Sequence, residues 1–517
     1  MPSPAPPSTP TDLIGGWLTV GLAKDPDALA LASATKNLSW RELQQQSSRL
    51  ASGYLSLGLS PGDRVASLMP NHPELIVHYL ACLKAGLVAT PLNYRYTAAE
   101  IDHALAVSGA AMLLHHAERE PDIAATQQSG RLRCGLVRCG APDARGPQLE
   151  ELLDRPADQR DLSPPPPDSP AFIYFTSGST GKPKGVTHTQ QTFAWMTLLT
   201  IRGLELTADD AFLSAASLSH IGGSLFGLAT LARGARLVIA RRGEGPEVLP
   251  LLRNHRPTVL WMLPAALIAL VRDHDAGRAD FSSVRCCFSG GDKVSAELER
   301  EFTSLAGFPV DESYGMTECG LTTINPPAGE NRIGSVGQPI SGYEVSLRDD
   351  SGGEVPTDEP GRLWLRSAAN TPGYWDNPRA TREAIVDGWL DTGDVMRADP
   401  EGYLWFCGRK KQIIIHDGSN ICPQEVEEAV AGHAAIASAG VIGVHDAVHG
   451  ENVRAYVTLR EGAPRPTTAE VIAFARQQVG YKAPDEVVVL DRMPLNATGK
   501  VDRVALKQMA MERLATG

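Results

Sequence analysis

The chain has 517 residues, more than one hydrophobic core usually supports, so we expect at least two domains. Its composition, 43% hydrophobic and 21% charged, is ordinary for a soluble globular protein, and no stretch approaches the roughly 18 apolar residues of a membrane span. A net charge of −12 argues against nucleic acid as a bulk partner, although it allows a local basic site for a polyanionic ligand.

The first ten residues, MPSPAPPSTP, are rich in proline and lack the basic start and apolar stretch of a signal peptide. We therefore expect a disordered tail over residues 1–12 and a cytoplasmic protein. The eight cysteines are scattered without zinc-ligand spacing. We interpret them as reduced thiols: Cys82, Cys134, Cys139, Cys286, Cys287, Cys319, Cys407 and Cys422.

Residues 41–110 alternate helical patterns with short apolar runs such as RVASLM and LVATPL, which is typical of strands alternating with helices. After the prolines at 164–167, the run AFIYF at 171–175 predicts a strand, and a glycine-rich loop follows it directly. Between 210 and 310, the runs ARLVIA, PTVLWML and VRCCFSGG alternate with helical stretches. This alternation predicts stacked parallel α/β layers.

Between residues 330 and 406 the pattern changes to short alternating segments such as YEVSLRD, GRLWLRS and GYLWFCG, which predict a small antiparallel β unit. A new α/β pattern then begins, with a strand in QIIIH and a helix that starts at Pro423, where a missing N–H costs little. We place the domain boundary before this pattern, with an N-terminal domain over 13–408 and a C-terminal domain over 409–517.

The segment YFTSGSTGKPKG, residues 174–185, places hydroxyls, glycines and lysines directly after the predicted strand. Glycines let backbone N–H groups approach oxyanions closely, hydroxyls add donors and lysine supplies countercharge. The spacing of a Walker loop is absent, and a flexible linker is the alternative. We predict a nucleotide-binding loop whose binding residues are Thr176, Ser177, Gly178, Ser179, Thr180, Gly181 and Lys182.

Four further motifs follow in order along the chain: YGMTE at 314–318, WLDTGD at 389–394, GRKK at 408–411 and NATGK at 496–500. Together with the glycine-rich loop they resemble the signatures of the adenylate-forming superfamily of acyl- and aryl-CoA synthetases, peptide-synthetase adenylation domains and luciferases. Five matches in the correct order over most of the chain make coincidence negligible.

The resemblance implies a large N-terminal domain of layered α/β subdomains with a small β unit, joined by a hinge at Lys411 to a small, mobile α+β C-terminal domain. It implies an ATP-dependent acyl-CoA synthetase, an AMP-forming acid–thiol ligase. Such an enzyme activates a carboxylic acid as its acyl-adenylate with release of pyrophosphate, then transfers the acyl group to CoA with release of AMP. The expected partners are therefore the acid, ATP and CoA, and the expected cofactor is Mg²⁺.

The motifs assign the nucleotide site. An aromatic ring at Tyr314 can stack on a purine, and the carboxylate of Glu318 offers the hard oxygen ligand that Mg²⁺ prefers. Asp394 can accept from both ribose hydroxyls, and Arg409 can donate to the same sugar or to phosphate. The remaining nucleotide-binding residues of the YGMTE motif are Gly315, Met316 and Thr317.

The resemblance makes Lys500 the catalytic lysine. Attack of a carboxylate on the α-phosphate needs no proton transfer, because the nucleophile is already ionised. Catalysis must therefore come from positioning and from cations that face the developing charge. The ammonium of Lys500, together with Mg²⁺ at Glu318, would supply this charge.

SLSHIGG, residues 217–223, resembles the family segment whose histidine, here His220, lies beside the acyl pocket and the thiol channel. The resemblance therefore implies a catalytic role for His220, although a structural histidine is the alternative. Gly222 and Gly223 leave room for a bulky apolar acid or only allow close helix packing. Gly290 and Gly291, followed by Asp292, resemble the loop that contacts the adenine, with a plain turn as the alternative.

The chain departs from the family pattern in two places. Glu312 and Ser313 stand where many relatives carry Gln-Gly. Because the resemblance places Ser313 beside the acyl pocket, this change puts the identity of the substrate in doubt. Arg362 replaces the glutamate of the usual Gly-Glu-Leu-Trp, which we interpret as a surface change.

Two other functions stay open. One is an acyl-AMP ligase that loads a separate carrier protein, although GSNICPQEVE, with Gly418 and Ser419, resembles the segment that lines the pantetheine tunnel of CoA ligases. The chain ends 17 residues after Lys500, so we expect no fused carrier domain. The other is an inactive nucleotide-binding regulator, against which the retained Glu318 and Lys500 argue. The sequence identifies neither the acid, whether fatty, aryl, dicarboxylic or polycyclic, nor a homo-oligomer.

Overall fold

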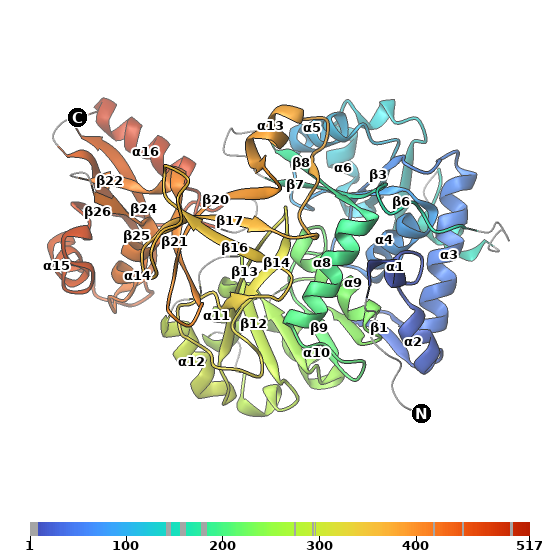
Figure 1. Ribbon diagram of the computed structural model, residues 1–517, viewed down its shortest axis with the longest axis horizontal. Helices are drawn as coiled ribbons and strands as arrows, with labels where there is room; N and C mark the ends of the chain where they lie inside the picture. The colour runs from blue at the N-terminus through green and yellow to red at the C-terminus, as the bar shows by residue number, and fades with distance from the viewer. Residues whose placement is uncertain are drawn as a thin grey trace. The chain divides into compact units, whose positions relative to one another are not determined.

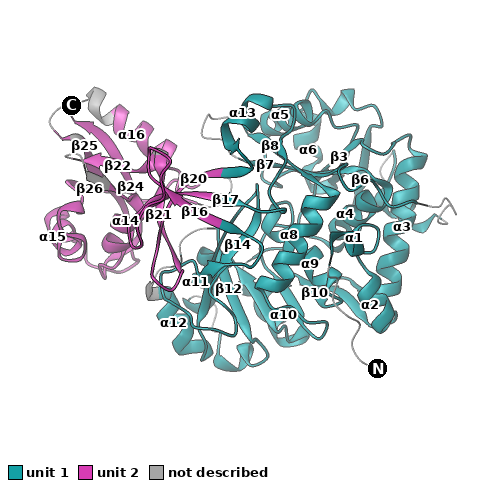
Figure 2. Cartoon of the chain, in the orientation of Figure 1, with its two compact units in different colours: residues 1–294, 298–344, 365–390 teal, residues 295–297, 345–364, 391–517 magenta. Residues whose placement is uncertain are grey.

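The chain folds into two compact units (Figure 2): unit 1 comprises residues 1–294, 298–344 and 365–390, and unit 2 comprises residues 295–297, 345–364 and 391–517. The expected boundary at residues 408 and 409 stays a prediction. This computed structural model describes residues 9–140, 146–155, 162–176, 183–243, 245–272, 276–291, 294, 296–416, 419–446, 449–496 and 500–516.

The first sheet of unit 1 runs, within the described residues, in the order β18 (Gly373–Tyr374), β8 (Lys184–Thr189), β7 (Pro170–Thr176), β4 (Val88–Pro91), β3 (Arg64–Leu68), β5 (Met112–His116) and β6 (Leu136–Cys139). The strands from β7 to β6 pair in parallel, whereas β8 pairs antiparallel with β7 and with β18. Along the chain, helix α4 (Pro73–Ala85) lies between β3 and β4, and α5 (Ala98–Ser108) lies between β4 and β5. This order confirms the alternation of strands and helices predicted for residues 41–110.

The second sheet of unit 1 runs in the order β15 (Gln338–Pro339), β14 (Gly320–Ile324), β13 (Val310–Met316), β12 (Cys286–Gly290), β11 (Val259–Met262), β9 (Ala211–Ser214), β10 (Arg236–Ile239), β1 (Leu29–Ser33) and β2 (Asn37–Ser39). The strands from β13 to β1 are parallel. Three of them form from the apolar runs that predicted them, namely β10, β11 and β12. The stacked parallel layers are thereby confirmed.

Two helices join the sheets of unit 1, as Figure 1 shows near the centre of the unit. Helix α8 (Gln190–Gly203) packs against β7 and β8 of one sheet and β14 of the other, and α9 (Ile221–Ala232) packs against α8, β9 and β10. Every residue of α9 from Gly223 to Ala232 is buried, because a helix that is apolar on all sides is stable only inside a core.

The chain up to residue 390 contains further α-helices. They are α1 (Pro10–Leu13), α2 (Thr19–Lys24), α3 (Trp40–Ser56), α6 (Glu120–Ala124), α7 (Leu149–Asp154), α10 (Gly245–His255), α11 (Pro264–Arg272), α12 (Ala296–Ala306) and α13 (Pro378–Ala384). Residues 1–8 of the expected tail lie outside the described residues, and α1 begins inside the remainder.

A small sheet contains β16 (Glu344–Arg348), β17 (Gly361–Arg366), β20 (Trp389–Ala398) and β19 (Ile385–Val386), and β21 (Leu404–Arg409) also pairs with β20. β20 is antiparallel to both β19 and β21. This sheet is the antiparallel β unit that the alternating segments between residues 330 and 406 predict.

Unit 2 also holds a sheet in the order β23 (Ser419–Ile421), β22 (Ile414–His416), β25 (Gly450–Leu459) and β24 (Ile436–Asp446), with β26 (Glu486–Val489) beside β25. Its helices are α14 (Pro423–Ala431), α15 (Thr468–Val479) and α16 (Arg503–Thr516). As predicted, QIIIH forms a strand and α14 begins at Pro423. The small α+β domain is confirmed.

All eight cysteines carry free thiols, as expected. No helix within the described residues is long and apolar enough to cross a membrane. The same part of the chain contains no group of three or more His, Cys, Asp or Glu side chains that could hold a metal ion by itself.

Candidate functional site

The glycine-rich loop joins two strands of a hairpin. β7 ends at Thr176, which pairs across the hairpin with Lys184 at the start of β8. The loop therefore leaves the sheet at the carboxyl end of β7, the position expected for a phosphate-binding turn. The predicted residues that lie outside the described part of the chain are Ser177, Gly178, Ser179, Thr180, Gly181 and Lys182.

Tyr374 connects this hairpin to Glu318. β18 pairs with β8 and places Tyr374 opposite Val186, so the Lys184 ammonium lies 5.4 Å from the centre of the tyrosine ring. The Tyr374 hydroxyl donates a 2.9 Å hydrogen bond to Oε1 of Glu318. Local sequence does not indicate Tyr374 as a site residue, because its partner lies 56 positions away in the chain.

Glu318 lies in the turn between β13 and β14 and is 7% exposed. Its backbone carbonyl accepts a 2.7 Å hydrogen bond from the N–H of Thr371, three residues before Tyr374. The segment 371–374 therefore holds both the backbone and the side chain of Glu318. A buried carboxylate with such partners stays in one orientation, which a metal ligand requires.

The same turn is held from a second side by His188 on β8. The Nε2 of His188 lies 2.8 Å from the carbonyl oxygen of Thr317, and burial lowers the histidine pKa to about 4. At neutral pH the imidazole is therefore uncharged, and its Nε2–H donates to Thr317. Sequence analysis missed His188, because it lies 129 positions before its partner.

The structure brings the predicted adenine residues together at the carboxyl ends of two parallel strands. Gly290, the last residue of β12, pairs with Ser313 on β13, next to Tyr314. A Cβ atom on Gly290 would lie 2.6 Å from both the carbonyl oxygen and Oγ of Ser313, so only glycine fits. Gly291 follows with φ of +83°, a conformation that favours glycine.

The neighbouring residues of the YGMTE motif are also packed closely. A Cβ atom on Gly315 would lie 2.4 Å from the carbonyl oxygen of Gly320, so β13 and β14 can cross there only with glycine. The Oγ of Ser313 donates a 3.0 Å hydrogen bond to the carbonyl of Ser289, which directs the hydroxyl toward β12. The assignments of Ser313, Tyr314, Gly315 and Met316 to the acyl and nucleotide sites stay predictions.

His220 is the N-cap residue of α9 and is half-buried. The space beside Gly223 is filled by backbone, since a Cβ atom there would lie 2.2 Å from the carbonyl oxygen of Ser217. This geometry supports close packing at Gly223 rather than room for a substrate. Gly222 instead faces a ring, because its Cβ atom would lie 2.7 Å from Cη2 of Trp261.

Trp261 belongs to an aromatic cluster. Its ring lies edge-on to Phe226 with centroids 4.6 Å apart, and nearly parallel to Phe288 at 6.0 Å. Gly222 is therefore the predicted pocket residue that borders a large apolar surface. The assignment of His220, Gly222 and Gly223 to the acyl pocket stays a prediction.

In unit 2, Asp394 on β20 pairs in register with Arg409 at the end of β21. The Nε of Arg409 lies 3.0 Å from Oδ1 of Asp394, whose side chain is only 2% exposed, while Arg409 is 57% exposed. The structure thus joins the two residues that the motifs assign to the ribose. A buried carboxylate beside an exposed guanidinium is suited to accept hydroxyls while the cation reaches phosphate.

Three predicted features of unit 2 are only partly described. Lys411 lies in the 3-10 turn Lys410–Gln412 that follows β21, and its side chain is outside the described part. Gly418 is also outside it, and of Ser419 only the backbone, at the start of β23, is described. Their roles as hinge and CoA channel stay predictions.

Lys500 lies at the base of the NATGK turn and is exposed. Its N–H donates a 3.1 Å hydrogen bond to Oδ1 of Asn496, and the N–H of Asn496 donates to its carbonyl at 2.8 Å. These two bonds connect the backbone of Lys500 to Asn496. Residues 497–499 lie outside the described residues.

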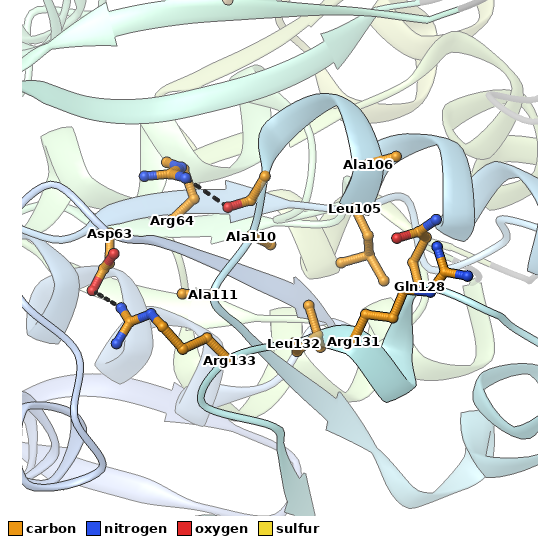
Figure 3. A pocket seen from close by; sticks show the side chains of 11 residues that line it. Asp63, Arg64, Leu105, Ala106, Ala110, Ala111, Gln128, Arg131, Leu132 and Arg133 are labelled. Carbon is orange, nitrogen blue, oxygen red and sulfur yellow. Dashed lines mark hydrogen bonds and ion pairs between the residues drawn. The ribbon is translucent and has the colours of Figure 1, made fainter.

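A cavity of about 290 Å³ lies elsewhere in unit 1, and none of the predicted site residues lines it (Figure 3). Two of its arginines have partners in the fold. Arg64 donates to the carbonyls of Ser108 and Gly109, and Arg133 forms an ion pair with Asp63. We therefore do not assign the reaction to this cavity.

Comparisons with known proteins agree with the motifs. Residues 19–375 match the family model of the AMP-binding enzyme, and residues 425–500 match that of the AMP-binding enzyme C-terminal domain. The chain is 34% identical over 492 residues to a feruloyl-CoA synthase of an Amycolatopsis species, covering 94% of this chain and 97% of the relative.

Two further similar proteins have names that give different acceptors for the acyl group, a carrier protein in one case and CoA in the other. A fatty acid–[acyl-carrier-protein] ligase, ScoC of Streptomyces coeruleorubidus, is 30% identical over 497 residues and covers 93% of each chain. The crystal structure of a benzoate CoA ligase from Burkholderia xenovorans LB400 superposes with a TM-score of 0.87 at 27% identity, covering 96% of this chain and 99% of that one.

Proposed function

Because the chain belongs to the AMP-binding enzyme family and is an AMP-forming acid–thiol ligase, we propose that it activates a carboxylic acid with ATP and transfers the acyl group to CoA. The observation that carries this proposal is the pairing of Gly290, at the end of β12, with Ser313 on β13, directly before Tyr314. Ligands of parallel α/β sheets bind at such carboxyl strand ends.

In the first half-reaction, a carboxylate oxygen of the acid attacks the α-phosphorus of ATP, and the bond to the bridging oxygen breaks so that pyrophosphate leaves. Tyr314 would stack on the adenine, with Gly290 and Gly291 close to its edge. Asp394 would accept the ribose hydroxyls beside Arg409. In the second half-reaction, the thiol of CoA loses its proton, its sulfur attacks the acyl carbonyl, and AMP leaves with the electrons of the broken C–O bond.

Mg²⁺ fits the chemistry around Glu318. The described residues hold no cluster that could bind a metal alone, whereas Mg²⁺ is commonly held by one or two carboxylates and substrate phosphates. Glu318 would hold the ion, which when bound would neutralise phosphate charge. The hydrogen bond from Tyr374 orients the carboxylate for this purpose.

Lys500 would place its ammonium against the carboxylate of the acid and the α-phosphate. Its backbone is bonded to Asn496 and the residue is exposed, which suits a lysine that serves one half-reaction only. Lys411 would be the pivot between the two half-reactions, and Gly418 and Ser419 would line the channel for the CoA thiol.

The acid we propose is bulky and apolar, with aryl acids first. Gly222 faces the ring of Trp261, which packs with Phe226 and Phe288. Flat aromatic surfaces pack well against such a cluster. The names of the feruloyl-CoA synthase and the benzoate CoA ligase support the same class of substrate.

The second candidate is a ligase that loads a carrier protein, which the similarity to ScoC favours. Both candidates share the first half-reaction and differ only in the thiol that accepts the acyl group. The test begins with pyrophosphate release across a panel of aryl, fatty, dicarboxylic and polycyclic acids with ATP and Mg²⁺.

The best acid is then incubated with ATP and CoA, and the products are followed by mass spectrometry. An acyl-CoA thioester is the expected product. Accumulation of acyl-AMP with CoA untouched, together with loading of a phosphopantetheinylated carrier protein, would replace the proposal with the second candidate. A protein that binds ATP but exchanges no pyrophosphate with any acid would overturn both.

A further inference from the structure

Arg362 on β17 is more than the surface change that its sequence position indicated. Its Nε donates a 2.6 Å hydrogen bond to Oδ1 of Asp391 on the neighbouring strand β20, and its Nη2 contacts Oδ2 of the same carboxylate. The guanidinium therefore binds Asp391 with two parallel contacts, the geometry that gives arginine its directional specificity. The Asp391 side chain is 9% exposed, against 34% for Arg362.

Asp391 in turn shapes the turn that leads to the ribose residue. Its Oδ1 accepts a 3.1 Å hydrogen bond from the N–H of Gly393, which adopts φ of +71°. Thr392 adds a second connection, since its Oγ1 donates to the carbonyl of Leu363 on β17 at 2.8 Å and accepts from the N–H of Asp394 at 3.1 Å. The backbone from Asp391 to Asp394 is thus attached to β17 twice.

This series of contacts leads from Arg362 through Asp391 to Asp394, the buried carboxylate that pairs with Arg409. Without Arg362, the nearly buried Asp391 would lose its cationic partner, and an uncompensated buried charge is unfavourable where it lies. Movement of the Asp391 carboxylate toward solvent would release the N–H of Gly393 and alter the direction of the next side chain.

We propose that Arg362 is a positioning residue for nucleotide binding, which holds Asp391 so that Asp394 presents its carboxylate to the ribose hydroxyls. The inference rests on the proposed function and adds a residue that acts through Asp391 and never touches the nucleotide. A residue that served only the stability of the sheet would affect all nucleotides equally. Arg362 should instead affect only the part of the affinity that depends on the ribose hydroxyls.

The experiment measures the dissociation constants of ATP and 2′,3′-dideoxy-ATP by calorimetry, so no acid needs to be known. In the unsubstituted protein, loss of both hydroxyls should weaken binding by about tenfold or more, because hydrogen bonds to a charged group are strong. The ratio of the two dissociation constants, that of 2′,3′-dideoxy-ATP divided by that of ATP, should fall toward one in Arg362→Met. It should also fall toward one in the positive control Asp394→Ala. Arg362→Lys, which keeps the charge but lacks the fork, should give an intermediate ratio.

Two further variants make the test specific. Asp391→Ala, which removes the acceptor of the Gly393 N–H, should lower the ratio of the two dissociation constants as Arg362→Met does. Arg397→Met is the control, because it removes another ion pair of β20, to Asp358, that does not touch the turn. It should leave the ratio unchanged.

An unchanged ratio in Arg362→Met, with a melting temperature near that of the unsubstituted protein, would overturn the inference alone. If Arg362→Met does not fold, the same decision is made on Arg362→Lys. An unsubstituted protein that binds neither nucleotide would instead contradict the proposed function. Tight binding of both nucleotides without discrimination would remove the ribose role of Asp394 and the inference with it.

Discussion

The hydroxyl of Tyr374 donates to the carboxylate of Glu318 at 2.9 Å, and the Lys184 ammonium lies over the same ring. One aromatic side chain thus connects the hairpin that carries the glycine-rich loop with the acidic residue of the YGMTE motif. Hydrogen bonds to charged groups contribute about 1.5–3 kcal/mol each, so this contact is strong enough to decide the orientation of Glu318.

Tyr374→Phe should reduce the rate of ATP–pyrophosphate exchange by about tenfold or more and raise the Mg²⁺ concentration needed for half-maximal rate. The ring and its packing are kept, so only the orientation of Glu318 is lost. Tyr94→Phe is the matched control, because it removes a 2.7 Å bond from a tyrosine to Glu118 away from the motifs. Equal losses in both variants, or no change in Mg²⁺ dependence for Tyr374→Phe, would contradict this role.

Lys500→Ala should slow formation of acyl-AMP by at least ~10²–10³, because a preorganised charge facing the transition state is removed. Acyl-adenylate supplied directly should be converted to the thioester at a nearly normal rate. Single-turnover measurements of each half-reaction check this. Lys507→Ala removes an exposed lysine of α16 as the control. The idea fails if Lys500→Ala slows both half-reactions equally while ATP affinity and fold stay normal.

Lys411→Pro should leave the first half-reaction mostly intact and impair transfer to CoA. Proline holds φ near −65° at the proposed pivot, which lies in the turn directly after β21. The measurement compares pyrophosphate exchange with thioester formation. Lys410→Ala, one residue before the pivot and paired with Asp350, should leave both rates near normal. Normal thioester formation in Lys411→Pro would remove Lys411 from the mechanism.

Asp311 on β13 should make stability depend on pH. Burial raises its pKa to about 6 from 3.8, although Asn331 and Cys286 donate to its carboxylate. The folded protein holds this proton more tightly than the unfolded chain does. The contribution of protonated Asp311 to the free energy of unfolding is therefore fully present below pH 3.8 and is lost as the pH rises through 6. The full difference corresponds to roughly 3 kcal/mol.

The melting temperature of the unsubstituted protein minus that of Asp311→Asn should therefore decrease between pH 4 and 6.5. Asp210→Asn is the control, because the pKa of Asp210 is shifted in the opposite direction to that of Asp311. Burial is the largest single effect and raises the Asp210 pKa, but the hydrogen bonds from Arg285, Thr258 and Thr207 and the charge of Arg285 together lower it to about 2. The stabilising charge of Asp210 is therefore lost only in more acidic solution. Its melting difference should stay constant from pH 4.5 to 6.5. If the melting-temperature difference for Asp311→Asn stayed constant with pH, the buried carboxyl would not titrate in this range.

The two glycines after His220 should separate substrate selection from stability. Gly222→Ala displaces the ring of Trp261 and should raise KM for aryl acids more than for acetate. Gly223→Ala forces a methyl group against the backbone of Ser217 and should lower stability by about 1–3 kcal/mol, with little dependence on the acid. Kinetics across the acid panel and thermal melting check both. If only Gly223→Ala changed KM for some acids more than for others, Gly223 and not Gly222 would be the residue that selects the substrate.

Local patterns in the chain were sufficient to predict much of this fold. Apolar runs bounded by glycine and proline become β10, β11 and β12, and Pro423 opens α14, because strand pairing and helix starts depend on residues that are neighbours in sequence. The motif order also indicated the adenylate-forming family, and paired residues such as Asp394 and Arg409 do meet.

The sequence by itself determined the family and the α/β layering, and it predicted the types of residue that handle the nucleotide. Only the tertiary structure decided which other side chains hold those predicted residues in place. Tyr374 reaches Glu318 across 56 positions, and Arg362 reaches Asp391 across 29. It also showed that backbone fills the space beside Gly223. The physical reason is that these contacts depend on the register of strands that pair over long separations, which local periodicity does not encode.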